Sequence, residues 1–212
     1  MAKRIATLAV RLLSANLLVM LVALFVMLPL TRFLENVALY QWFITAIFAG
    51  VMLVIVWFDT TSVGQKDVQK DKFLKRKMAQ DGYIPTPDDK LQYVGWLGFA
   101  AGFAAQSPFF VLALVAGFAG MAGSTINAVL IPILRFWNVM YLQVFEAFPG
   151  SLPWVFLLLP VIYSVVAGLG YRNGPVQQAR MEVIIERNKS RKAKRVQDDK
   201  KKAQMRKKPT RR

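Results

Sequence analysis

Four long apolar runs without a single charge constrain this chain more than any other feature. The hydrocarbon core of a bilayer is about 30 Å thick, so a helix needs roughly 20 mostly apolar residues to cross it. A helix also satisfies its own backbone hydrogen bonds, as the membrane interior requires. The sequence therefore predicts an all-α, polytopic membrane protein with four transmembrane helices, at about residues 12–30, 37–58, 93–120 and 154–171.

The composition fits this prediction once charge is followed along the chain. Hydrophobic residues make up 55% of the 212 residues, and the formal net charge is nevertheless +16. A soluble domain carries about 45–50% apolar residues. The two properties are segregated, because residues 1–58 contain four Lys or Arg and one acid, whereas residues 172–212 contain sixteen Lys or Arg and four acids. This pattern is typical of membrane spans followed by a basic tail.

Residues 1–58 are expected to form an N-terminal transmembrane hairpin. The first apolar run is longer than the core of about 7–15 residues found in signal peptides, and a small-x-small cleavage site does not follow it, so we expect an uncleaved span. A short turn at residues 32–36 then forces the two helices to run antiparallel. Asp59 ends the second run and begins an aqueous loop at residues 59–92.

The third run divides in composition at Ser107-Pro108. Proline removes a backbone donor and kinks a helix, so a single tilted, kinked span over residues 93–120 is the preferred interpretation. A re-entrant hairpin broken at the proline is the alternative. Together with the run at 154–171, this segment makes the second membrane pair, within residues 93–171.

Segment 126–148 lies between the last two spans and is less apolar. Arg135 at the centre of a crossing helix would cost about 2.5–3.5 kcal/mol, and Pro132 and Glu146 interrupt the segment further. Its aromatic and polar side chains suit a helix at the membrane surface. We therefore expect an external interfacial or re-entrant segment in place of a fifth crossing.

Orientation follows the distribution of basic residues, since Lys and Arg are retained on the cytoplasmic side. With four spans, the N-terminus, the 59–92 loop and the tail share one side and contain twenty-six Lys or Arg; the other side contains only Arg32 and Arg135. A fifth span would carry the tail across the membrane. Both termini are therefore expected in the cytoplasm. The membrane is expected to be a bacterial cytoplasmic membrane.

The residue types argue against catalysis. The chain has no His and no Cys, and the four spans contain no ionisable residue other than tyrosine. Histidine-dependent triads, cysteine zinc sites and intramembrane carboxylate relays therefore have no residues to build on. We expect a non-enzymatic protein without a metal or another cofactor.

Two sets of residues inside the spans are candidates for packing or for a polar pathway. Gly98, Gly102 and Ala105 place small residues on one helix face, where backbones can approach closely, either inside the bundle or against a partner subunit or a second copy. The candidates for a polar pathway are Asn16, Gln106 and Arg135. For the first two, interhelical hydrogen bonding is the alternative.

The tail, residues 172–212, has a net charge of +12 and few apolar residues, so it is expected to be helical or disordered without a core. Gly174 predicts a helix end and Pro175 the first position of a new helix. Three partners suit the tail: the anionic leaflet, nucleic acid or the ribosome bound without sequence specificity, and an acidic protein. The basic residues expected to contact an anionic surface are Lys189, Arg191, Lys192, Lys194, Arg195, Lys200, Lys201, Lys202, Arg206, Lys207 and Lys208.

These features favour an integral membrane scaffold or accessory subunit whose tail contacts anionic lipid or an anionic partner. The alternative is a channel or transporter component, including a holin-like pore former, that would use the broken third span and segment 126–148.

Overall fold

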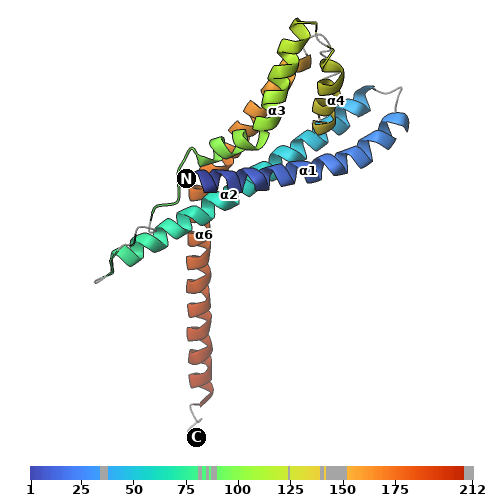
Figure 1. Ribbon diagram of the computed structural model, residues 1–212. Coiled ribbons are helices and arrows are strands. Elements are labelled where there is room, and N and C mark those ends of the chain that lie inside the picture. The colour runs from blue at the N-terminus through green and yellow to red at the C-terminus, as the bar shows by residue number, and fades with distance from the viewer. Residues whose placement is uncertain are drawn as a thin grey trace. The chain divides into compact units, whose positions relative to one another are not determined.

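The computed structural model describes residues 1–33, 38–80, 83–84, 86, 90–123, 125–138, 141 and 152–207. These residues form five helices: α1 (Ala2–Phe33), α2 (Ala38–Met78), α3 (Leu97–Met121), α4 (Asn127–Trp137) and α6 (Leu152–Lys207) (Figure 1). Four of them, all except α4, are long and apolar enough to cross a membrane. The predicted all-α fold with four membrane-spanning helices is confirmed.

Helix α2 is longer than the predicted second span. It continues through Asp59 to Met78 as one helix of 41 residues, so the first part of the expected loop is an extension of the span. The extension has a buried face and an exposed face: Asp67 and Asp71 are buried, whereas Lys66 and Lys70 are exposed. The buried face of this extension positions the polar network described below.

Helix α3 runs without interruption through Pro108. Proline cannot donate to the carbonyl four residues earlier, which here belongs to Ala104. The hydroxyl of Ser107 donates to that carbonyl oxygen instead, at 2.9 Å. Because a neighbouring side chain replaces the lost donor, the third span is one helix, as the preferred interpretation has it, and the re-entrant hairpin is wrong.

Helix α4 turns back along α3. The turn uses Gly123 at φ +65°, a conformation that glycine adopts without strain. The ring of Trp137 then stacks on Phe109 with centroids 4.1 Å apart, and Leu134 is completely buried. A helix of 11 residues is only about 16 Å long, shorter than the roughly 20 residues that a crossing helix needs. The interfacial and re-entrant alternatives for segment 126–148 both stay predictions, since residues 142–148 lie outside the described part of the chain.

The chain divides into two compact units, Met1–Gly174 and Pro175–Arg212. The first contains a core of buried side chains from α1, α2, α3 and α6, with Leu12, Met52 and Tyr171 among the largest completely buried residues. The second contains the C-terminal part of α6, where every described side chain from Ala179 to Asp199 except Glu182 is exposed.

The expected helix end at Gly174 is wrong, since α6 continues through Gly174 and Pro175 to Lys207. Gly174 instead lies at a close contact with α2. A Cβ atom added there would collide with the backbone of Gly64 and Gln65 on α2. Gly174 therefore permits two helix backbones to touch, a use of glycine that is common in membrane bundles. The tail is helical as far as Lys207.

Candidate functional site: a polar network at one end of the bundle

A buried carboxylate connects three helices of the first unit. Asp67 on α2 accepts a hydrogen bond from the guanidinium of Arg4 on α1, with which it forms an ion pair, and another from the hydroxyl of Tyr171 on α6 at 2.7 Å. The side chain of Asp67 is only 7% exposed. A buried charge is tolerated when it is paired and hydrogen-bonded. The two donors therefore make this buried position possible.

The same network holds the chain segment that precedes α3. Asp71, one turn after Asp67, accepts hydrogen bonds from the backbone N–H groups of Gln92 at 2.6 Å and Tyr93 at 2.9 Å. The second guanidinium nitrogen of Arg4 donates to the carbonyl of Gln92. Four segments that are distant in sequence thus meet within two turns of α2.

An aromatic pair covers this network. The rings of Tyr93 and Tyr171 are stacked, with centroids 5.2 Å apart and planes within 2° of each other. Tyr93 lies before α3 begins, and burial raises the pKa of its phenol above the ordinary value, while the charge of Arg172 lowers it. The stack connects the segment before α3 to α6, and the hydrogen bonds to Asp71 connect the same segment to α2.

A second ion pair lies nearer the apolar part of the bundle. Arg11 on α1 donates to Asp59 on α2 at 2.5 Å, with 48% and 25% of the respective side chains exposed. Arg11 lies seven positions after Arg4, and Asp59 lies eight positions before Asp67. This matched spacing fits two antiparallel helices. The more exposed pair is the weaker of the two, because solvent screens it.

Small residues let α6 approach α2 closely beside the network. A Cβ at Gly64 would collide with the carbonyl oxygen of Tyr171, and a Cβ at Gly170 would lie 2.8 Å from the carbonyl oxygen of Trp57. The hydroxyl of Thr61 donates to the Gly170 carbonyl at 2.9 Å. This close crossing determines where Tyr171 sits, and hence its contact with Asp67.

The small residues predicted on the third span lie against the other side of α6. A Cβ at Gly98 would be 2.6 Å from the carbonyl oxygen of Ala167, and one at Gly102 would be 2.7 Å from the Ala167 side chain. The hydroxyl of Ser164 donates to the Phe99 carbonyl at 2.7 Å. Ala105, the third member of the set, is buried as well. In the described contacts, these glycines pack within the same chain.

The three residues predicted for a polar pathway have different surroundings. Asn16 and Gln106 are buried, at 4% and 5% exposure, whereas Arg135 is exposed. Within the described part of the chain, no hydrogen bond or ion pair joins them. A polar pathway shared by these three residues therefore stays a prediction.

The tail residues predicted to contact an anionic surface lie on the C-terminal part of α6 or beyond it. Five of them have described side chains, all exposed: Lys189, Arg191, Lys192, Lys194 and Arg195. The backbone of Lys200, Lys201, Lys202, Arg206 and Lys207 is helical. Lys208 lies outside the described residues.

The sequence-based predictions missed the network altogether. They place Asp67 and Asp71 in the aqueous loop at residues 59–92 and Arg4 in the basic segment before the first span, without a contact between them. A signal was present, since Thr60, Gly64, Asp67 and Asp71 are spaced by four, three and four residues, which places them on one helix face. A face that combines small residues with acids, inside a lysine-rich segment, indicates a buried contact.

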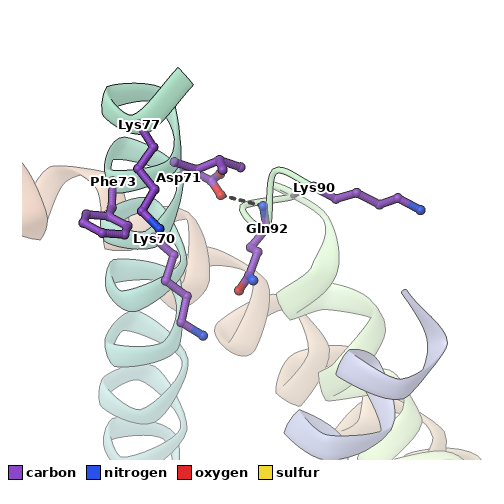
Figure 2. A pocket seen from close by; sticks show the side chains of 7 residues that line it. Lys70, Asp71, Phe73, Lys77, Lys90 and Gln92 are labelled. Carbon is purple, nitrogen blue, oxygen red and sulfur yellow. Dashed lines mark hydrogen bonds between the residues drawn. The ribbon is translucent and has the colours of Figure 1, made fainter. Parts of the chain in front are cut away.

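A small cavity of about 170 Å³ lies beside Asp71. Residues of α2 and of the segment before α3 line it, and Figure 2 shows the hydrogen bond from the Gln92 backbone to Asp71 at its edge. Within the described residues, no group of three or more His, Cys, Asp or Glu side chains could hold a metal ion.

Comparison with protein-family models, with curated proteins and with solved structures finds no match to this chain.

Proposed function

We propose that the protein is a non-enzymatic membrane scaffold or accessory subunit whose basic tail contacts an anionic surface in the cytoplasm. One observation carries this proposal: a single helix, α6, contains both a membrane-spanning part and an exposed basic part. The basic part has few apolar side chains with which to build a core of its own. Its side chains are therefore available for a partner.

The arrangement of the basic segments supports the same proposal. The polar network brings together Arg4 in the N-terminal segment, Gln92 at the end of the 59–92 loop and Tyr171 just before the tail. Each of the three basic segments is thus connected to the same end of the bundle. Such an arrangement agrees with four crossings and with both termini on the cytoplasmic side.

Anionic lipid is the partner that this chain suits best. Each Lys or Arg close to an anionic leaflet contributes about 1 kcal/mol, and the tail directly follows the fourth span in the sequence. Nucleic acid or the ribosome is the second candidate, through phosphate contacts alone, since residues 172–212 contain no aromatic side chain for base stacking.

The test compares tail variants of the full-length protein held in zwitterionic nanodiscs. Vesicles containing anionic lipid, or purified ribosomes, are added, and capture is measured at several salt concentrations. Replacing the basic residues from Arg187 onward with glutamine should abolish capture. Replacing the lysines of the same segment with arginine, which preserves the charge, should leave capture unchanged. The proposal would be contradicted if the glutamine variant were captured as well as the parent protein, with the same dependence on salt concentration.

A channel or transporter component is the weaker candidate. It gains support from the polar side chains buried in the spans, among them Asn16, Thr45 and Gln106. It loses support from the unbroken α3 and from the exposure of Arg135. Ion flux through the purified protein in proteoliposomes tests this function, and flux that disappears in an Asn16→Leu variant would favour it over the scaffold.

A further inference from the structure

The cavity beside Asp71 has the chemistry of a site for an anion. Its described lining includes three lysines, Lys70, Lys77 and Lys90, and one acid, Asp71. Lys70 and Lys77 belong to α2, whereas the ammonium of Lys90 points away from that helix (Figure 2). Its volume of about 170 Å³ compares with about 30 Å³ for one molecule of liquid water. The cavity therefore has space for a group as large as a phosphate.

The positive charge of this cavity is not neutralised by the acids that the structure describes. Both carboxylate oxygens of Asp71 already accept backbone N–H groups, from Gln92 and Tyr93. Asp67 and Asp59, two other acids of α2, form ion pairs with Arg4 and Arg11. The three cavity lysines therefore have no carboxylate partner in the described part of the chain.

Two of the lysines lie on the same face of α2. Lys70 and Lys77 are seven residues apart, about two helical turns, and Figure 2 shows Lys77 extending along α2 toward Lys70. The ammonium of Lys77 lies 4.9 Å from the ring centroid of Phe73 and 5.8 Å from that of Tyr83. Attraction to the rings holds this ammonium in place without occupying its three donors, which stay available for an oxygen ligand.

We propose that this cavity binds a phosphate-bearing ligand. Lysine recognises phosphate as a compact, mobile point charge, and two lysines on one face suit a group with more than one negative charge. Phe73, which is 61% exposed, and Leu74 provide apolar surface for the organic part of the ligand. A soluble phosphate compound and a lipid headgroup share this chemistry.

The test is calorimetric titration of inorganic pyrophosphate into the full-length protein in detergent, at fixed ionic strength. The variant Lys70→Gln/Lys77→Gln removes two charges from the cavity. Its matched control, Lys75→Gln/Arg76→Gln, removes two exposed charges from the same helix outside the cavity. Every protein has the same tail, so binding by the tail cancels in the comparison. A Lys70→Arg/Lys77→Arg variant restores the charge and shows whether a loss comes from misfolding.

We expect the cavity variant to bind pyrophosphate about tenfold more weakly or worse, because it loses two charge-assisted contacts, while the control variant and the arginine variant bind like the parent protein. Equal weakening in the cavity variant and the control would overturn the proposal, and so would a parent protein that binds neither pyrophosphate nor phosphatidic acid. Native mass spectrometry from nanodiscs identifies the source: retention of phosphatidic acid by the parent, lost in the cavity variant, supports a lipid headgroup. Pyrophosphate binding without such retention supports a soluble ligand.

Discussion

Asp67 accepts hydrogen bonds from Arg4 and Tyr171, two residues at opposite ends of the membrane-spanning part of the chain. Their helices, α1 and α6, contain the first and the last of the four spans. One carboxylate on α2 therefore links the first and the last span. Its contribution to the free energy of unfolding can be measured.

Replacing Asp67 with asparagine should destabilise the folded protein by about 3 kcal/mol, because removal of one member of a buried pair leaves the other charge uncompensated. The partial exposure of Arg4, at 31%, places the effect at the lower end of the range for buried pairs. The measurement is equilibrium unfolding in a mild detergent, followed by circular dichroism.

Asp59→Asn is the matched control for that variant. It removes the same chemical group from the same helix, but its ion pair with Arg11 is much more exposed. Exposed pairs contribute about 0–1 kcal/mol. If the two asparagine variants lose equal stability, burial does not make the Arg4–Asp67 pair contribute more to the free energy of unfolding than the exposed pair does.

The four spans could be predicted from sequence because membrane insertion depends on local apolarity, which the residues of each run carry by themselves. The contacts between spans could not be predicted in the same way. Gly174 is a local signal for a helix end and Pro175 for the start of a new helix, yet α6 continues through both, because the bundle uses Gly174 for a backbone contact with Gly64. Whether a glycine ends a helix or lets another helix approach depends on a neighbour that is distant in sequence.

The role of Gly64 can be tested by a single added methyl group. Gly64→Ala should destabilise the bundle by about 1–3 kcal/mol, the usual effect of overpacking, because the new Cβ would collide with the Tyr171 carbonyl. Gly50→Ala, in the same helix, meets nothing within 4 Å and should be neutral or slightly stabilising. Thermal unfolding of both variants in detergent provides the comparison, and a fully stable Gly64→Ala protein would contradict the close crossing.

Ser107 is expected to compensate for Pro108 in the third span. Ser107→Ala leaves the Ala104 carbonyl without its hydroxyl donor and should cost about 1–2 kcal/mol, since an unsatisfied polar group in an apolar environment is unfavourable. Ser14→Ala is the control, because Ser14 also donates to a carbonyl of its own helix, that of Val10 four residues earlier, at a position without a nearby proline. Unfolding in detergent should show a clear loss for the first variant only. Equal losses would mean that the proline has no influence on the serine.

The absence of cysteine from the sequence makes the orientation directly testable. Single cysteines at Ala122, Lys75 and Ser190, which are all exposed, sample the turn before α4, the extension of α2 and the tail. In intact bacterial cells, a membrane-impermeant maleimide should label Ala122→Cys, because that turn is expected outside. It should label Lys75→Cys and Ser190→Cys only after lysis, since positively charged segments stay in the cytoplasm. Labelling of Ser190→Cys in intact cells would place the tail outside and remove the basis for its proposed cytoplasmic contacts.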